Sequence, residues 1–297
     1  MRIAVTGRTG QVVQSLLARA ETAGVTVIPV GRPELDLAQP EGVRQALSAA
    51  RPDCIVNAAA YTAVDKAETE PELALRINSE GAGAVAAAAV ALGVPLIQIS
   101  TDYVFDGMAP HPWRESDATA PLSAYGRSKL AGEEAVIASG ADWTILRTAW
   151  VYSPYGANFV KTMLRLAESR DEIGVVSDQL GSPTSALDLA DAIIAVAKAL
   201  VARPDDASLR GVFHAAGTGE ASWADLAETV FVASAALGGP SAAVRRITTL
   251  DYPTPARRPT NSRLDCSLLI ERHGLSLPLW QASVKSCVAT LLAQPRS

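Results

Sequence analysis

Residues 1–11 read MRIAVTGRTGQ, and this stretch decides the fold of the chain. The apolar run at residues 3–6 predicts a buried strand, and the helical pattern that starts at Gln11 predicts a helix immediately after the turn. Glycine at Gly7 and Gly10 allows positive φ angles and a close approach of the backbone to a ligand. Because a helix N-terminus offers free N–H groups and a positive dipole end, we expect this turn to bind the pyrophosphate of a dinucleotide.

The alternation of strand and helix continues through the first half of the chain. Short apolar runs predict strands at residues 3–6, 25–30, 54–57, 96–100 and 144–147, and helical patterns lie between them at 11–23, 40–50, 71–92 and 123–139. Strands that alternate with helices form parallel sheets with right-handed crossovers. The predicted fold class is therefore α/β, with a Rossmann-type doubly wound parallel sheet in a dinucleotide-binding domain at residues 1–150.

After residue 150 the regular alternation of strand and helix becomes less clear. We predict helices at residues 158–167, 186–201, 223–236 and 279–292, and strands at 172–176 and 211–214. Residues 252–263 read YPTPARRPTNSR, and the prolines of this segment exclude a regular helix. We expect residues 151–297 to form mainly a smaller, discontinuous C-terminal substrate-binding domain, while segments within 172–216 return to the sheet.

The composition excludes several classes of protein. Apolar residues make up 48% and charged residues 19% of the 297 positions, which is too apolar for a largely disordered chain. With 26 basic and 31 acidic residues the net charge is −5, and without a long basic run we expect no nucleic-acid partner. The N-terminal apolar run is too short for a signal peptide or a membrane span, so we expect a soluble cytoplasmic protein. The widely spaced Cys54, Cys266 and Cys287 indicate neither a disulfide framework nor a zinc site.

The end of the second predicted strand distinguishes between two dinucleotides. An acidic residue there would bind the ribose 2′-hydroxyl of NAD, whereas an arginine can bind the 2′-phosphate of NADP. Arg32 stands at this place and favours NADPH, with NADH as the second option. Val13 occupies the position where a third glycine is common, so we expect either a slightly larger distance between helix and strand or a small residue opposite.

Tyr125 and Lys129 are the predicted acid–base pair, with ordinary packing on a helix surface as the alternative. Their spacing of four residues at the start of a predicted helix puts both side chains on one face. A phenol ordinarily has a pKa of about 10, and a nearby ammonium that stabilises the phenolate would lower the pKa of Tyr125. Thr101 ends the fourth predicted strand, where open α/β sheets bind their ligands, and its hydroxyl can orient a substrate carbonyl.

Longer stretches of the chain resemble the extended short-chain dehydrogenase/reductase family, and the resemblance covers nearly the whole sequence. The stretches that carry it are GRTGQ (7–11), RPDCIVNAAAYTAVDKAE (51–68), STDYVFDG (100–107), residues 113–133 with the core YGRSK (125–129), RTAWVY (147–152), NFVKTMLRLA (158–167), DQLGSPT (178–184) and YPTPARRPTNSRL (252–264). The two longest of these, 51–68 and 113–133, go far beyond what the general fold requires.

The resemblance implies roles for individual residues. It implies that Thr101, Tyr125 and Lys129 are the catalytic residues, and that Tyr125 and Lys129 also bind the cofactor. Further positions that match the cofactor site are Gly7, Gly10, Gln11, Val12, Asp36, Leu37, Ala58, Ala59, Ala60 and Thr62. The positions near the sugar, beside Thr101 and Tyr125, are Val64, Asp102 and Trp150, and an indole offers apolar area to a deoxysugar. The arginines within 252–263 are candidates for a diphosphate.

The resemblance also implies an activity. The expected reaction is the NADPH-dependent reduction of the C4 keto group of dTDP-4-dehydro-β-L-rhamnose to dTDP-L-rhamnose, a precursor of cell-envelope polysaccharide. Two alternatives stay open, namely another nucleotide-sugar reductase or epimerase of the family, and a non-catalytic regulatory subunit similar to the β subunit of methionine adenosyltransferase. The expected partner is a small sugar nucleotide, without membrane contact, and the protein is expected to be a monomer or homodimer.

One departure from the family bears on metal binding. Some members dimerise through Mg²⁺ held by carboxylates of the first helix and of the helix that follows the DQLGSPT-type segment. Here Ser15 stands where an acid is expected, and Leu187 precedes Asp188 and Asp191 in the later helix. The sequence therefore argues against a bridging Mg²⁺, and reduction of a ketone by a nicotinamide needs no catalytic metal.

Overall fold

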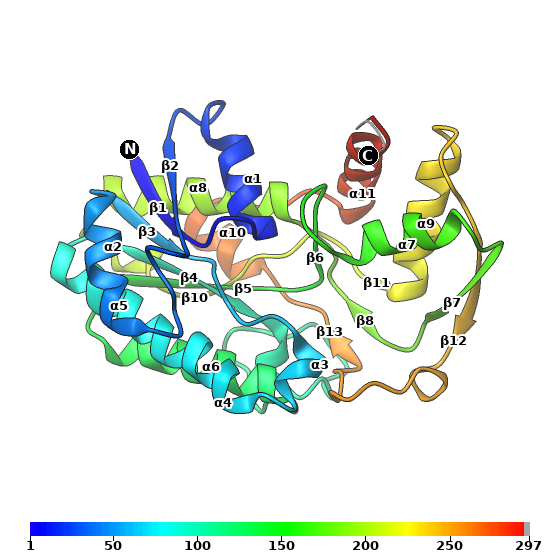
Figure 1. Ribbon diagram of the computed structural model, residues 1–297, viewed down its shortest axis with the longest axis horizontal. Helices are drawn as coiled ribbons and strands as arrows, with labels where there is room; N and C mark the ends of the chain where they lie inside the picture. Colours follow the sequence, from blue (N-terminus) through cyan, green and yellow to red (C-terminus); the bar gives the residue numbers. More distant parts are fainter. Residues whose placement is uncertain (294–297) are drawn as a thin grey trace.

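The computed structural model describes residues 1–293, and its centre is a six-stranded parallel sheet (Figure 1). The strand order is β10-β5-β4-β3-β1-β2, with β1 at the point where the direction of winding reverses. The strands are β1 (Arg2–Thr6), β2 (Thr26–Val30), β3 (Cys54–Asn57), β4 (Leu96–Thr101), β5 (Trp143–Thr148) and β10 (Gly211–His214). The predicted fold class is confirmed, because short apolar runs form strands that are buried on both faces.

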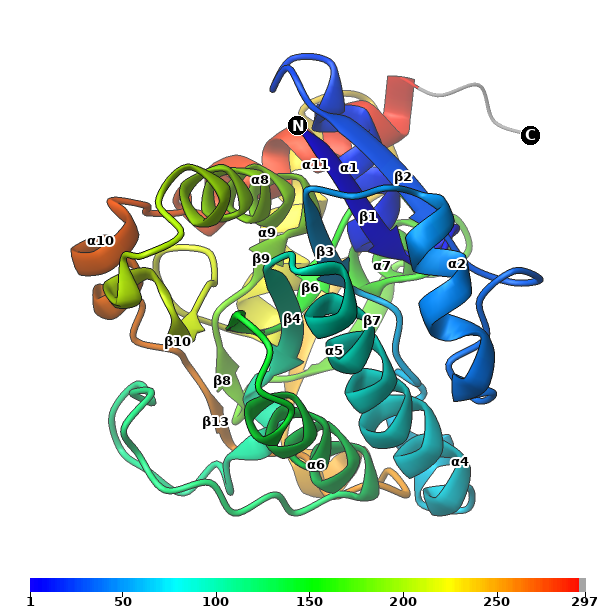
Figure 2. The ribbon, with the colours of Figure 1, turned by 90° about the vertical axis from the view of Figure 1, so that its left-hand side faces the viewer.

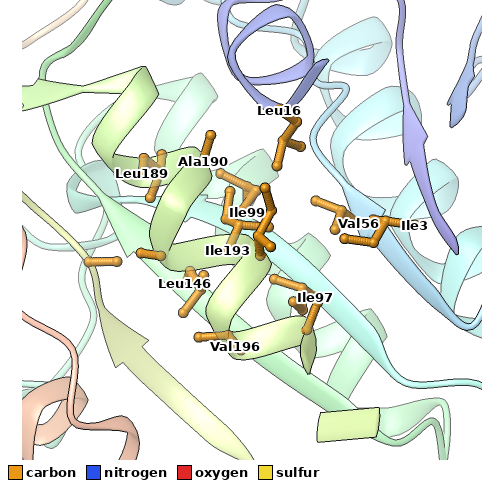
Figure 3. Packing of buried hydrophobic residues seen from close by; sticks show 14 of the residues in the cluster. Ile3, Leu16, Val56, Ile97, Ile99, Leu146, Leu189, Ala190, Ile193 and Val196 are labelled. Carbon is orange, nitrogen blue, oxygen red and sulfur yellow. The ribbon is translucent and has the colours of Figure 1, made fainter. Parts of the chain in front are cut away.

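Helices cover both faces of this sheet (Figure 2). On one face α1 (Gln11–Ala20) packs against α8 (Ala186–Ala202), and side chains such as Leu16 and Ile193 meet the strand residue Ile97 in a buried cluster (Figure 3). On the other face α2 (Val43–Ala49), α5 (Gly81–Leu92) and α6 (Ala124–Ala138) bury a second cluster. The α8 helix and β10 lie after residue 150, so part of the later chain completes the sheet and its cover.

Three further helices and the remaining strands build a second part of the molecule beside the sheet (Figure 1). The helices there are α7 (Phe159–Ala167), α9 (Trp223–Ala235) and α11 (Trp280–Ala293), which share an apolar core. The strands are β6 (Val151–Tyr152), β7 (Glu172–Val176), β8 (Leu180–Gly181), β9 (Thr184–Ser185), β11 (Ala221–Ser222), β12 (Ala243–Ile247) and β13 (Asn261–Ser262). They form three small sheets, β11-β8-β13, β12-β7 and β6-β9. The division into domains at residue 150 stays a prediction.

Several local predictions need correction. Within the range 172–216, β10 pairs with β5 in the central sheet, but β7 pairs with β12 outside it. The helix predicted at 71–92 consists of α4 (Pro71–Leu75), a π-helical turn η2 (Arg76–Glu80) and α5. The first helix ends at Ala20, three residues early, because residues 21–24 form a turn.

Some short elements were not predicted. These are α3 (Val64–Ala67), α10 (Ser267–His273), the strands β6, β8, β9, β11, β12 and β13, and the 3-10 turns η3 (Asp102–Val104), η4 (Ala207–Leu209) and η5 (Thr249–Asp251). The helix predicted at 40–50 begins as the 3-10 turn η1 (Pro40–Gly42) and continues as α2. Within residues 1–293, none of the helices combines the length and apolar character that a membrane crossing needs.

Candidate active site

A cleft of about 710 Å³ opens at the carboxyl ends of the central strands. It is lined by the turn after β1, the loop after β3, the ends of β4 and β5, and the start of α6. The predicted site residues that line it are Gly7, Gly10, Gln11, Val12, Arg32, Ala58, Ala59, Ala60, Thr62, Val64, Thr101, Asp102, Tyr125, Lys129 and Trp150. Residues far apart in the sequence therefore meet at the edge of the sheet where open α/β folds bind ligands.

Asp36 and Leu37 are the two predicted site residues that do not line the cleft. Leu37 is buried in the cluster between the sheet and α5, and a Cβ on Gly81 would lie 2.8 Å from its side chain. Asp36 accepts a hydrogen bond from the backbone N–H of Ala38 at 3.0 Å, as in a local turn. The structure thus gives Leu37 a packing role, because its side chain faces the core and not the cleft.

The turn after β1 needs glycine at Gly7. Its φ angle is 97°, and its N–H donates to the carbonyl oxygen of Val30 at 2.8 Å, which ties the turn to the end of β2. A Cβ at Gly7 would lie 3.4 Å from Val13 Cγ2 and 3.5 Å from Ala59 Cβ. Val13 stands where the third glycine is common, and its side chain lies beside Gly7. How the chain accommodates it, by a larger distance between helix and strand or by a small residue opposite, stays a prediction.

A chain of buried polar side chains holds the loop after β3. The Thr6 hydroxyl donates to Asn57 Oδ1 at 2.7 Å, and Asn57 Nδ2 donates to Gln98 Oε1 at 2.7 Å. Thr6 Oγ1 also accepts from the backbone N–H groups of Ala58 and Ala59, at 3.0 and 2.9 Å. The polar Gln98 in an otherwise apolar strand was the sequence signal for this chain, and it was missed.

The start of α6 is fixed so that Tyr125 and Lys129 face the cleft. Ser123 caps the helix and accepts from the Gly126 N–H at 3.1 Å, and Gly126 packs so tightly on the Tyr103 carbonyl that no side chain fits. Lys129 is buried, and its Nζ donates to the Ile99 carbonyl oxygen at 2.7 Å. The backbone of β4 near its carboxyl end thereby orients the ammonium.

The electrostatics of Tyr125 differ from the prediction. Burial raises the pKa of Tyr125 above its ordinary value, and the charge of Asp102 adds to the rise, while a hydrogen bond with Thr101 opposes it. Burial also lowers the pKa of Lys129 to about 8, against the charge of Glu133. The expected lowering of the pKa of Tyr125 by Lys129 is therefore wrong, and the phenol is protonated near neutral pH.

Thr101 and Asp102 form one buried unit beside the tyrosine. Thr101 Oγ1 donates to Asp102 Oδ1 at 3.0 Å and accepts from the Tyr103 N–H at 3.3 Å. Burial raises the pKa of Asp102 to about 6, and its Oδ2 has no partner among the described residues. The hydroxyls of Ser100 and Thr148, which were not predicted as site groups, also line the cleft. Both are buried, and neither has a hydrogen-bond partner within residues 1–293. These groups leave hydrogen-bonding capacity directed at a ligand.

The three arginines of segment 252–263 have different surroundings. Arg258 lines the cleft, and it donates to Asp65 Oδ2 at 2.7 Å and to the Tyr103 hydroxyl at 3.2 Å. Arg263 instead bonds Glu220, Asn261 and the Pro110 carbonyl. Arg257 is exposed and lines no cavity described here. Arg258 is thus the arginine of the segment best placed for a diphosphate.

A second cavity, of about 490 Å³, adjoins the cleft between α7, β7 and the segment 252–258. Trp223 and Arg258 line both cavities. Trp223 stacks on Trp150 with ring centroids 3.6 Å apart and planes 10° from parallel. Trp150 has φ 49°, a left-handed conformation that costs a non-glycine residue about 1–2 kcal/mol. Strain of this kind is maintained only where surrounding contacts impose it.

The two carboxylates of α8 that are compared above with the Mg²⁺ ligands of some family members are engaged by protein groups. Asp191 pairs with Arg19 at 3.2 Å, and Asp188 accepts from the Ser283 hydroxyl. Within the described residues there is no group of three or more His, Cys, Asp or Glu side chains that could hold a metal. The absence of Mg²⁺ stays a prediction. The three cysteines are free in the structure.

Taken with the doubly wound sheet, the Tyr–Lys pair beside a glycine turn defines the class of short-chain dehydrogenases/reductases. A family model described as "RmlD substrate binding domain" matches residues 1–293, and the chain belongs to this family.

Named relatives agree with this assignment over the full length. The chain is 51% identical to a dTDP-4-dehydrorhamnose reductase of Sinorhizobium fredii over 294 residues, which is 99% of both chains. It superposes on the crystal structure of a dTDP-4-dehydrorhamnose reductase from Clostridium acetobutylicum with a TM-score of 0.89 and 38% identity, covering 98% and 100% of the two chains. The corresponding enzyme of Bacillus anthracis, solved in complex with NADP, gives a TM-score of 0.88 and 36% identity, with 97% and 99% covered.

Proposed function

We propose that the protein reduces the C4 keto group of dTDP-4-dehydro-β-L-rhamnose with NADPH and releases dTDP-L-rhamnose. The observation that carries the proposal is the meeting of Thr101, Tyr125 and Lys129 with the glycine turn in one cleft. The full-length similarity to reductases named for this substrate supports the same choice.

The residues present fit NADPH. Gly7 and Gly10 leave the backbone open beside the N-terminus of α1, where a pyrophosphate gains from the free N–H groups. Arg32 lines the same cleft, is exposed, and can pair with a 2′-phosphate. Lys129 and Tyr125 would hold the nicotinamide ribose. Bound NADPH would supply the hydride for the C4 carbon.

Tyr125 acts as the proton donor in this proposal. Its raised pKa keeps the phenol protonated, which is the form needed to protonate the oxygen of the reduced ketone. Thr101 orients that oxygen, because its hydroxyl lines the cleft together with Tyr125 and is held by Asp102. Lys129 supplies a positive charge near the phenolate that remains after transfer, and the Ile99 carbonyl fixes its position.

The rest of the sugar nucleotide extends from the cleft toward the second cavity. Trp150, Val64 and Asp102 surround the deoxysugar, and Arg258, at the junction of the cavities, binds the diphosphate. The second cavity has room for the nucleoside. In this arrangement residues 1–150 mainly bind the cofactor and residues 151–297 mainly bind the sugar nucleotide.

A turnover assay tests the proposal directly. Purified protein is mixed with NADPH and the keto-sugar nucleotide, and the absorbance of the reduced nicotinamide is followed. We expect substrate-dependent oxidation, with NADH used less well. Tyr125→Phe is expected to lose at least a hundredfold in turnover while it still binds NADPH. Folded protein without turnover would refute the proposal, and stoichiometric bound NAD would point to an epimerase.

We further propose that the protein works in the cytoplasm as a monomer or homodimer. Its proposed substrate and NADPH are both cytoplasmic metabolites. Analytical ultracentrifugation with and without EDTA would give the oligomeric state. Dissociation by EDTA would contradict the expectation that no bridging Mg²⁺ is bound.

A further inference from the structure

A stacked pair of indoles from different segments lies where the two cavities adjoin. Trp150 lies between β5 and β6, and Trp223 is the first residue of α9. Their rings stack at 3.6 Å, and Trp223 lines both cavities whereas Trp150 lines the cleft. No prediction from the sequence singled out Trp223.

Trp223 is itself held firmly. Ser222 and Asp225 form a reciprocal capping box that fixes the start of α9. The Trp223 Nε1–H donates to Gln179 Oε1 at 3.2 Å, and the Phe159 ring lies 4.8 Å from the indole. These contacts do not involve Trp150, so the Trp223 ring can serve as a support for it.

Trp150 is the member of the pair that needs support. Its φ of 49° is left-handed, a conformation that a tryptophan does not adopt without constraint. Its indole also occupies the space where a side chain at Gly181 would lie. Gly181 permits the position of the indole, and stacking on Trp223 favours it.

From this geometry we infer that Trp223 is a positioning residue, which holds the Trp150 indole against the cleft and so sets the orientation of the sugar. The inference rests on the proposed function for its effect on turnover, but the placement of Trp150 is testable without it. Misplacement of a substrate by about 1 Å can cost up to a hundredfold in rate.

The first experiment measures the indole itself. The chain has five tryptophans, so 5-fluorotryptophan labelling gives five ¹⁹F resonances, and the one absent in Trp150→Phe belongs to Trp150. We expect this resonance to move or broaden in Trp223→Leu and to stay unchanged in the matched control Trp143→Phe, which alters a half-buried indole at the start of β5. A Trp150 resonance that is unchanged in Trp223→Leu overturns the inference, whether or not the protein turns over the keto-sugar.

The second experiment is a double-mutant cycle in the turnover assay. Trp223→Leu is expected to lower kcat/KM at least tenfold, and Trp223→Phe, which keeps a ring for stacking, to stay within threefold of the original. If Trp223 acts through Trp150, the variant with both Trp150→Leu and Trp223→Leu loses no more than Trp150→Leu alone. Losses that multiply mean that Trp223 contacts the substrate independently, which overturns the positioning role. An inactive original protein refutes the proposed function and leaves the ¹⁹F result to decide this inference.

Discussion

Gly181→Ala places a methyl group in the space of the Trp150 indole. The new Cβ would lie 2.6 Å from Cζ2 and 2.7 Å from Cδ2 of Trp150, whereas carbon atoms in contact prefer about 3.5–4.0 Å. The indole must therefore move by about 1 Å to restore normal contacts. Gly181 is not among the glycines with positive φ, so alanine adds no backbone strain of its own.

The cost of this change has two parts. Overpacking of a well-packed site costs about 1–3 kcal/mol, and we expect a fall of that size in the free energy of unfolding, measured by denaturant titration. Displacement of an indole that faces the cleft should also lower kcat/KM for the keto-sugar nucleotide by about ten- to a hundredfold. NADPH affinity, measured by fluorescence, should change little because the glycine turn is not altered.

Two further variants control the experiment. Gly42→Ala adds a methyl group where no atom lies within 4 Å, at φ −85°, and it should be neutral or stabilise by up to about 1 kcal/mol. Trp150→Leu in the Gly181→Ala background removes the colliding indole and should recover most of the lost stability. Full stability and normal kcat/KM in Gly181→Ala alone would refute the view that this indole is rigidly held.

Three other predictions concern charge. Burial lowers the pKa of Lys129 to about 8, so log kcat/KM should fall with slope −1 above pH 8. In Lys129→Arg this fall should be absent, because a guanidinium stays charged. Equal pH profiles of the two proteins would contradict the assignment. Burial, and the nearby positive charge of Arg147, lower the pKa of His214 to about 3. Burial of the neutral imidazole therefore contributes stability that is fully present above pH 6.5 and is lost as the pH falls toward 3. Relative to His214→Gln, the original protein should lose about 2 kcal/mol of unfolding free energy between pH 7.5 and pH 5, and a constant difference would refute the assignment. Arg258→Lys should raise the KM for the sugar nucleotide at least tenfold with little effect on NADPH affinity, and an unchanged KM would remove Arg258 from the diphosphate site.

The sequence predicted the central sheet well because each strand is a short apolar run that is buried on both faces. The runs at 54–57 and 96–100 have no exposed face, so local composition alone determines their place in the core. Strand β12 was missed because its sequence AVRRI is largely exposed and has no core face to reveal it. The π-helical turn at residues 76–80 was missed because it lies inside a continuous helical pattern.

The candidate site was predictable where a motif is local and less so where contacts are long-range. The glycine turn and the Tyr–Lys spacing appear in a few consecutive residues, and the structure brings both to the cleft. The bond from Lys129 to the Ile99 carbonyl joins residues 30 positions apart, and the bond between Arg258 and Asp65 joins residues 193 apart. The raised pKa of Tyr125 follows from burial, which no spacing in the sequence can express.

The late position of β10 in the chain has a consequence for synthesis and assembly. The last strand of the central sheet, Gly211–His214, pairs with β5 only after more than sixty intervening residues have been made. During translation β5 keeps an open hydrogen-bonding edge until that strand emerges, and open edges favour aggregation. A truncation at residue 150 would leave that edge unpaired and remove the α8 helix that covers one face. The two walls of the cleft are therefore expected to fold as one cooperative unit, so neither half is a sound starting point for a minimal fragment.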